Sequence, residues 1–335
     1  MKKKISIFLR KPIDGFHYSI EGYYRELFDF KKNSEYEYNL KICPLHSKGI
    51  FNRIILVIWA FFNQGDINHI CGDINFISFF LNKKKTINTF LDTYSMYRLK
   101  GIKREIYKFF WIKIPVYKSN FIISISKKTE NEIKKYLKFK KKSYVIEICA
   151  KKIFKKNIKK KISKKPKILL IGSSINKNLL NSIKSIKDIN CELLIVGKLN
   201  DKIKNHINRY NISYQNYFSQ SDKAIYKLYK KSDILLFASK YEGFGIPILE
   251  AQSVGRPVIT SNLDPMNFIA GKGAYLVNPN NPRNINLGIK KIINNKHLRT
   301  KLIKEGFKNT KRFDKSKIIK KHNNLYKNIL TEKEK

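Results

Sequence analysis

Glu242 and Glu250 stand with seven residues between them in a segment that also carries two glycines, Gly243 and Gly245. A carboxylate can accept two hydrogen bonds from a vicinal diol, which is what a ribose or a hexose presents. Glycines let a backbone approach a ligand closely. A helix that begins just after them offers free N–H groups and a partial positive charge, which suits a diphosphate. The residue types and their spacing therefore favour a site for a phosphorylated sugar.

The elements around these residues are predicted to hold both carboxylates at one crevice. A buried strand at Ile234–Phe237 ends in the loop that contains Glu242. Pro247 suits the first turn of a helix, and Gly255 suits its end, before the next strand begins at Pro257. In doubly wound sheets, ligands bind outside the carboxyl ends of the strands. We therefore expect Glu242 and Glu250 to face the same ligand.

The rest of the chain alternates strand-like and helix-like segments in two successive series, which predicts α/β units with parallel sheets. The strands predicted in the first series are Ile5–Leu9, Tyr38–Cys43, Ile67–Cys71, Thr86–Leu91, Phe121–Ser124 and Tyr144–Ile148. Its predicted helices are His17–Phe30, Phe51–Phe62, Ile102–Lys118 and Lys127–Tyr136, the last capped by Ser126. The strands predicted in the second series are Ile168–Gly172, Glu192–Gly197, Asp233–Ala238, Pro257–Ser261 and Ala274–Val277. A lysine-rich segment, Lys151–Lys167, separates the two series and is predicted to be a solvated linker.

Composition agrees with two folded domains. The 335 residues include 42% hydrophobic and 13% aromatic residues, enough to fill two interiors. The formal charge is +45, from 70 basic and 25 acidic residues, and the basic residues are nearly all lysines scattered through the chain. Two explanations stay open at this point. Biased codon usage would give this pattern without function, whereas a functional reading is attraction to an anionic membrane or to nucleic acid. A nucleic-acid reader would carry more arginine and a confined basic stripe, so nucleic acid is not the expected partner.

Other sequence features argue against a metalloprotein, a disulfide-linked protein and a membrane-spanning protein. The four cysteines, at positions 43, 71, 149 and 191, show no metal-type or redox spacing and are expected to be free, buried thiols in a reducing cytoplasm. No Asp-x-Asp pair suggests a metal site, and no metal or cofactor is expected. The longest apolar run, Ile54–Phe62, is about half of a membrane span, and no signal peptide is expected. The expected location is therefore cytoplasmic, with attachment to the inner face of a membrane left open.

The segment YEGFGIPILEAQSVGRPVITSN, which contains both glutamates, resembles the donor site of retaining glycosyltransferases of family 4, also called group 1. These enzymes have the GT-B fold, in which two Rossmann-like domains face each other across a cleft. The resemblance extends to Asn176-Lys177-Asn178 after the strand that ends at Gly172. It also includes His17–Glu21, following the loop near Gly15, and HICGD at His69–Asp73.

The resemblance implies a role for each matching residue. Glu250 would hold the ribose hydroxyls, and Glu242 would contact the donor sugar. Lys177 would offset the charge that develops on the leaving diphosphate. The remaining donor-site residues implied are Gly15, Gly172, Asn176, Gly243, Phe244, Gly245 and Ile246. Because exposed lysines are the default in this chain, a purely solvated Lys177 stays an alternative.

Two positions depart from the family pattern. Many members have a His-Asp pair at the end of an N-terminal strand, whereas this chain has Leu91-Asp92. Leucine can neither donate a hydrogen bond nor exchange a proton, so the role of that histidine is absent or supplied elsewhere. Asp92 remains a catalytic candidate, with a helix cap or turn as its alternative. Ser173 and Ser174 stand where the family often has an arginine. His17 and His69 could line the cleft or be packed structurally.

These observations predict an acceptor domain at 1–155, a donor domain at 156–314 and a helix at 315–335 that crosses back to the first domain. The expected activity is transfer of a sugar from a nucleoside-diphosphate-sugar to a glycan or lipid-linked acceptor, with retention of configuration and without a metal. Surface-polysaccharide synthesis is the setting that the resemblance implies. Two alternatives are a GT-B epimerase acting on the sugar nucleotide itself and a polyanion-binding protein that has lost catalysis.

Overall fold

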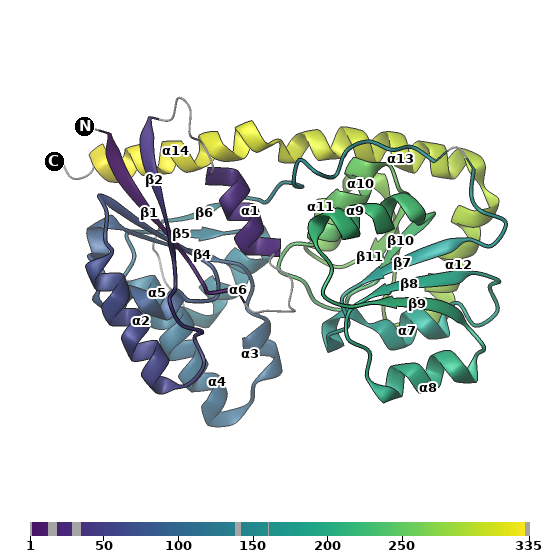
Figure 1. Cartoon of the computed structure of the whole chain (residues 1–335), viewed down its shortest axis with the longest axis horizontal. Coiled ribbons are helices and arrows are strands. Elements are labelled where there is room, and N and C mark those ends of the chain that lie inside the picture. Colours follow the sequence, from purple (N-terminus) through teal and green to yellow (C-terminus); the bar gives the residue numbers. More distant parts are fainter. Residues whose placement is uncertain (1, 13–18, 29–34, 138–141, 160, 332–335) are drawn as a thin grey trace. The chain divides into compact units, whose positions relative to one another are not determined.

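The computed structural model describes residues 2–12, 19–28, 35–137, 142–159 and 161–331. The chain divides into two compact units. Unit 1 contains residues 1–148 and 315–335, and unit 2 contains residues 149–314. Each unit has a parallel sheet with helices packed against it (Figure 1).

The sheet of unit 1 has six strands in the order β2-β1-β3-β4-β5-β6, and every neighbouring pair is parallel. Chain order reverses between β1 and β3. The strands are β1 (Lys3–Leu9), β2 (Tyr36–Ile42), β3 (Ile67–Cys71), β4 (Thr86–Phe90), β5 (Phe121–Ser124) and β6 (Ser143–Val145). The helices are α1 (Ser19–Phe28), α2 (Ile50–Phe62), α3 (Tyr94–Arg98), α4 (Gly101–Tyr107), α5 (Ile114–Tyr117), α6 (Lys127–Leu137) and α14 (Lys315–Thr331). Shorter helical segments are η1 (Asn75–Phe80), η2 (Lys83–Lys85) and η3 (Lys108–Lys113), the last a π-helix.

The sheet of unit 2 also has six parallel strands, in the order β12-β11-β10-β7-β8-β9. The strands are β7 (Lys167–Ile171), β8 (Glu192–Val196), β9 (Ser213–Tyr217), β10 (Ile234–Phe237), β11 (Val258–Ser261) and β12 (Ala274–Val277). The helices are α7 (Leu179–Lys184), α8 (Asp201–Arg209), α9 (Asp222–Lys231), α10 (Ile246–Val254), α11 (Met266–Ala270), α12 (Pro282–Asn294) and α13 (Lys296–Thr310). The 3-10 turns are η4 (Ile175–Lys177), η5 (Gly271–Gly273) and η6 (Lys311–Phe313).

The predicted fold class, two Rossmann-like α/β sheets, is confirmed. Eleven strands lie where the sequence places them, within three residues at each end. The sequence analysis missed β9, because its residues SYQNY are polar and mostly exposed at the edge of the sheet. The single helix predicted at 102–118 is instead α4, η3 and α5 in succession. Ser126 does cap α6, since its hydroxyl accepts from the N–H of Thr129.

Helix α14 packs on unit 1, although 166 residues of unit 2 precede it in the chain. Its Tyr326 hydroxyl lies 2.7 Å from Nδ1 of His69 on β3, and the Nε2 of that histidine lies 2.7 Å from the Thr89 hydroxyl on β4. Tyr38 on β2 donates a hydrogen bond to Asn323. Burial lowers the pKa of His69 far below its ordinary value, so the ring is neutral. His69 is therefore a packed residue of the interior.

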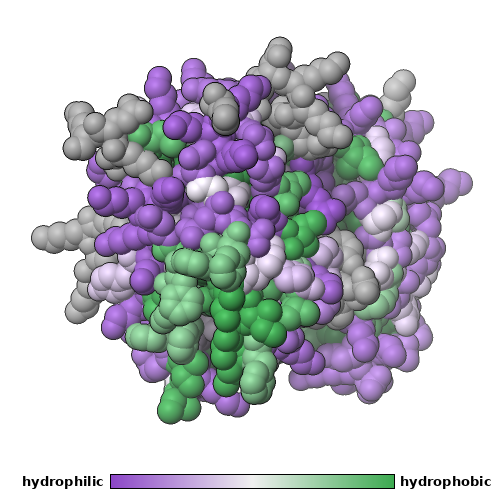
Figure 2. Space-filling view, turned by 60° about the vertical axis from the view of Figure 1, so that its left-hand side comes forward, coloured by the Kyte–Doolittle hydropathy of each residue, from purple (hydrophilic) through white to green (hydrophobic). Residues whose placement is uncertain are grey.

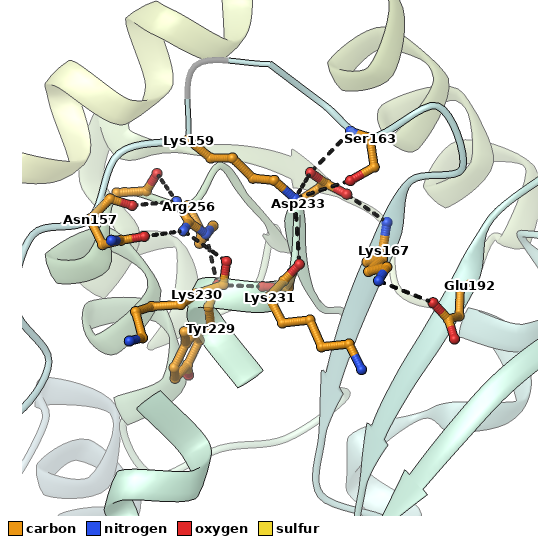
Figure 3. Close-up of polar contacts among 12 residues, drawn as sticks. Asn157, Lys159, Ser163, Lys167, Glu192, Tyr229, Lys230, Lys231, Asp233 and Arg256 are labelled. Atoms are coloured by element: carbon orange, nitrogen blue, oxygen red, sulfur yellow. Dashed lines mark hydrogen bonds and ion pairs between the residues drawn. The ribbon is translucent and has the colours of Figure 1, made fainter. Parts of the chain in front are cut away.

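The lysine-rich segment before β7 belongs to unit 2 and is therefore not a linker between the units, although most of its described lysines are exposed as predicted. Arg256, which is fully buried ahead of β11, donates to the backbone and side-chain oxygens of Asn157 (Figure 3). Asp233, buried ahead of β10, accepts from the Lys159 ammonium at 2.6 Å and from the backbone N–H of Lys167. A buried charge requires such partners. The local lysine pattern could not reveal them, because they lie about 70 to 100 residues further along the chain.

Candidate functional site

The polar residues singled out in the sequence gather where the strand order of unit 2 reverses. Counted along the chain from β7, the sheet reads 3-2-1-4-5-6, which is the Rossmann order. The reversal lies between β7 and β10, which pair directly. Lys177 follows β7, and Glu242 follows β10. Ligands of such sheets bind outside the carboxyl ends of the strands at this reversal.

Lys177 and Glu242 form an ion pair there. The Lys177 ammonium lies 2.8 Å from Oε1 of Glu242, and the two side chains are 20% and 12% exposed. The ammonium also lies 4.8 Å from the ring centre of Phe237, the last residue of β10. Lys177 is therefore not a purely solvated surface lysine, which was the alternative that the sequence left open. Since an ammonium has three donors, it can hold Glu242 and still bind an anion.

The loop after β7 is shaped to present Lys177. Gly172 has a φ of 92°, and a Cβ built on it would come within 2.8 Å of Cε of Lys177. The stem of the lysine therefore lies directly over the Gly172 backbone, which only glycine permits. Asn176 donates to the carbonyl of Tyr241, and its own carbonyl accepts from the N–H of Lys240. The loops that carry Lys177 and Glu242 are thus joined by two hydrogen bonds beside the ion pair.

The segment after Glu242 forms the predicted turn into a helix. Gly245 has a φ of 111°, and α10 begins at Ile246, with Pro247 in its first turn. Gly255, in the left-handed conformation, ends the helix as the sequence predicts. Phe244 does not present its ring to a ligand, because the ring is buried edge-to-face against Phe313. The groups of this turn that can contact a ligand are therefore backbone atoms.

Glu250 lies on α10 and is 8% exposed. The Tyr229 hydroxyl lies 2.9 Å from its Oε2. Burial raises the pKa of Glu250 to about 7, an effect that the Tyr229 hydrogen bond and the charge of Lys151 oppose. A nearly buried carboxylate with one protein hydrogen bond retains unused acceptor capacity. It can therefore accept hydrogen bonds from hydroxyl groups of a ligand.

Two further residues complete the surroundings of Glu250, and the sequence analysis did not single them out. Tyr229, on α9, is held through its backbone carbonyl by Nε of Arg256 at 2.7 Å. Lys151 is 9% exposed and binds both carboxylate oxygens of Asp222, at 2.9 and 3.0 Å. Neither residue stands near Glu250 in sequence. Tyr229 is part of no recognisable motif, and Lys151 is one of many lysines in its segment, so the sequence does not distinguish them.

Asp92 belongs to unit 1 and has a local structural role there. Its carboxylate accepts from the N–H of Tyr94, two residues on, as in the turn alternative. Burial, and then the charges of Asp73 and Asp92, raise the pKa of Tyr107, so these two carboxylates lie near that ring. Leu91 is half-buried beside Asp92. Whether Asp92 takes part in catalysis stays a prediction.

The other unit 1 residues named in the sequence analysis divide into two groups. Gly15 and His17 lie outside the described residues. Glu21 of α1 forms an ion pair with Arg10, just after β1, which agrees with an anchoring role for this element. Among the described residues, no group of three or more His, Cys, Asp and Glu side chains could hold a metal ion. The four cysteines are free and buried.

The match of this chain to a known protein family lies in unit 2. Residues 151–309 match the family model described as Glycosyl transferases group 1. A curated relative from Methanocaldococcus jannaschii, named an uncharacterized glycosyltransferase, is 29% identical over 154 residues, which cover 45% of this chain and 44% of the relative. The Escherichia coli O-antigen chain mannosyltransferase B is 39% identical over 59 residues, 18% of this chain and 16% of the relative. The matched regions thus span less than half the length of these curated relatives.

The matches to solved structures extend over almost the whole chain. A glycosyltransferase from Rickettsia africae has a TM-score of 0.71 at 18% identity, and the match covers 98% of this chain and 99% of that one. The Anabaena protein HepE, in a structure with UDP-glucose, has a TM-score of 0.76 at 13% identity, over 97% and 100% of the two chains. At these identities the likeness shows the fold alone, which is GT-B.

Proposed function

We propose, because residues 151–309 match the family model of the group 1 glycosyl transferases, that this chain transfers a sugar from a nucleoside-diphosphate-sugar to a glycan or lipid-linked acceptor. The observation that carries the proposal is the ion pair of Lys177 with Glu242 at the strand reversal of unit 2, directly before helix α10, which carries Glu250. A cation, two carboxylates and a helix N-terminus together suit a sugar diphosphate.

Each of these residues has a chemical role in the proposal. Glu250 accepts hydrogen bonds from the two ribose hydroxyls, and Glu242 contacts the donor sugar. The ammonium of Lys177 faces the diphosphate, whose negative charge grows as its bond to the sugar breaks. Lys177 is already fixed by Glu242 and Phe237, so it needs little reorganisation when that charge develops. The transfer proceeds with retention of configuration and without a metal ion.

The setting that we propose is surface-polysaccharide synthesis. Two of the curated relatives are named O-antigen chain mannosyltransferases, from Escherichia coli and Salmonella typhimurium. These names describe enzymes that build a surface glycan. They support a glycan or lipid-linked acceptor for this chain, which spans only part of those relatives in the match.

Nucleotide binding tests the proposal. We expect UDP, GDP or ADP to bind the wild-type chain with micromolar affinity by calorimetry at pH 8, where Glu250 is ionised. Glu250→Ala should weaken that binding about 100-fold, because hydrogen bonds to a charged group contribute roughly 1.5–3 kcal/mol each. Glu305→Ala, which removes a surface carboxylate of the same unit, should leave the affinity unchanged.

Two other results would contradict the assignment. If none of the nucleotides binds, or if Glu250→Ala binds as well as the wild type, the donor site does not lie at the strand reversal. Product analysis with each sugar nucleotide and no acceptor then separates transfer from epimerisation, because an epimerase converts the donor without an acceptor.

A further inference from the structure

Helix α2 exposes apolar side chains that unit 1 does not cover. Of its 13 residues, only Asn52 and Arg53 are polar, yet only Leu56 and Ala60 are buried. Phe51 and Phe62, near its two ends, are 84% and 78% exposed. A helix that is apolar on all sides is normally buried or placed in a membrane. With 13 residues, α2 is too short to span a bilayer, and no helix among the described residues is long and apolar enough to do so.

The neighbouring helices extend this surface. Helix α2 packs on η1, and η1 in turn packs on η3. The Arg53 guanidinium of α2 lies 4.7 Å from the ring centre of Trp111 in η3, which joins the two helices directly. Helix α4 also packs on η3. We define the apolar patch as the exposed apolar side chains of α2, η1, α4 and η3. They are Ile50, Phe51, Ile54, Ile55, Ile58, Phe61, Phe62, Phe79, Phe80, Ile102, Ile106, Phe109 and Phe110.

The apolar patch is larger than the surfaces that monomeric proteins usually leave exposed. Figure 2 shows apolar side chains gathered on one face of the molecule, with hydrophilic side chains around them. With roughly 150–250 Å² per aromatic side chain, its phenylalanines alone expose on the order of 600 Å². The largest patch on a typical monomer is about 300–600 Å². The isoleucines add to this, so the surface requires a partner.

The charges around the apolar patch are strongly basic. Residues 46–118, which contain the patch, include twelve Lys and Arg residues but only four Asp and Glu residues. The Lys113 ammonium lies 5.6 Å from the ring centre of Phe109, at the border of the patch. The other basic side chains exposed beside the patch elements are Lys48, Lys83, Lys84, Lys100, Lys103, Arg104 and Lys118. An apolar face rimmed by cations is the pattern of a surface that lies in the headgroup region of an anionic membrane.

We propose that the apolar patch of unit 1 binds the surface of an anionic lipid bilayer, with the apolar side chains among the headgroups and the lysines on the lipid phosphates. A second copy of the chain would also cover apolar side chains, but it would bring two strongly basic rims together. Like charges across an interface oppose association, whereas anionic lipids neutralise them. This inference goes beyond the proposed function and does not depend on it.

Intrinsic fluorescence tests the inference, because both tryptophans of the chain lie in these elements, Trp59 in α2 and Trp111 in η3. The full chain is titrated at physiological ionic strength with vesicles of phosphatidylcholine and phosphatidylglycerol, and with vesicles of phosphatidylcholine alone. We expect a blue shift and saturable binding with the anionic vesicles, and at least tenfold weaker binding to the neutral ones. Equal binding to both would overturn the role given to the basic rim.

A variant separates the apolar patch from the general charge of the protein. The double substitution Phe51→Ser and Phe62→Ser changes two highly exposed side chains, so it should leave thermal unfolding unchanged. We expect it to weaken binding to anionic vesicles at least tenfold. The matched control is Leu287→Ser in unit 2, which is 55% exposed and lies outside the patch. If the double variant binds like the control, dispersed charge alone explains the binding and the inference is wrong.

Two further measurements on the same samples complete the test. Sedimentation without lipid should show the wild type as a monomer at micromolar concentration. A dimer that the double variant abolishes would show that a second copy covers the patch, which contradicts the inference. Nucleotide affinity should be equal in the wild type and the double variant. If the double variant loses vesicle binding but keeps its nucleotide affinity, the substitutions have affected the apolar patch alone. If neither protein binds nucleotide, the proposed function fails, but the comparison of vesicle binding still tests the inference.

Discussion

The two units have closely related sheets, but they stabilise their buried polar groups in different ways. In unit 2, ionisable groups are buried beside other charges and carbonyls, as at Arg256 and Asp233. In unit 1, the polar group at the centre of the sheet is a neutral imidazole, His69, held between two hydroxyls. The difference concerns the sheets themselves, because the carboxylates that unit 1 buries, Glu21 and Glu130, lie on helices α1 and α6 and are paired there with basic side chains. Unit 2 buries charges directly ahead of its strands, whereas unit 1 has a neutral ring inside its sheet.

The family model matches residues 151–309, and this range contains Lys177, Glu242 and Glu250. In the proposed function, the groups for the donor come from two loops of unit 2, with Lys177 after β7 and Glu242 after β10. The interior of unit 1 is described instead by the packing of side chains such as Phe28 and Tyr326 around His69.

The largest effect that would sharpen the comparison is expected from Arg256→Met. It removes a fully buried guanidinium and leaves carbonyls of Tyr229, Lys230 and Asn157 without their donor. We expect a loss of about 3 kcal/mol in the stability of unit 2, since breaking a buried charged network is strongly destabilising. Amide hydrogen exchange should show faster exchange in α9, β10 and β11. Unchanged exchange there would mean that charge does not stabilise unit 2.

Acidification should affect unit 1 in particular. Burial lowers the pKa of His322, on α14, from its ordinary value near 6.5 to about 3. Its neutral form therefore stabilises the fold above pH 6.5, and this contribution is lost as the pH falls from 6.5 toward 3. Between pH 7 and 5 we expect His322 alone to contribute a loss of about 2 kcal/mol in unit 1, and His69, whose pKa is also lowered by burial, to add to it. Tryptophan fluorescence during urea unfolding measures this loss, since Trp59 and Trp111 both lie in unit 1.

A matched variant tests the assignment to His322. In His322→Phe the ring contacts with Phe28 and Tyr326 can be kept, and the titrating group is removed. The loss between pH 7 and 5 should then be smaller than in the wild type. If the two proteins lose stability equally, another group is responsible.

The smallest effect, with the opposite sign, is expected at Glu250. Its folded pKa of about 7 lies above the ordinary value of 4.5. The carboxyl therefore favours folding in its protonated form, and this contribution is lost as the pH rises from 4.5 through 7. The rise in the pKa of Glu250 corresponds to roughly 3 kcal/mol at pH 8. Because the buried amide of the variant loses part of this gain where its hydrogen bonds are unmet, Glu250→Gln should be about 1–2 kcal/mol more stable than the wild type at pH 8 and no more stable at pH 4.5. Urea unfolding followed by far-UV circular dichroism at the two pH values provides the measurement, and equal stability at pH 8 would contradict it.

Much of this architecture follows from the sequence, because buried strands carry unbroken apolar runs. The turn at Gly245 and the end of α10 at Gly255 were predictable from local residue types. Strand β9 was not, since an exposed edge strand has no apolar pattern. Tyr229 and Lys151 could not be placed beside Glu250, because only tertiary structure brings α9 and the start of unit 2 to that helix. The ion pair of Lys177 with Glu242 was likewise unforeseen, although each residue was named.

The position of α14 has a consequence for synthesis on the ribosome. Unit 2 is continuous from residue 149 to 314 and can assemble as soon as it emerges. Unit 1 needs α14 to cover Phe28 and His69, and that helix emerges only after the whole of unit 2. At about 5–20 residues per second, the first unit waits on the order of ten seconds or more for its last helix. The nascent chain therefore presents an incomplete first unit beside a finished second one, which makes it a natural client for chaperones during translation.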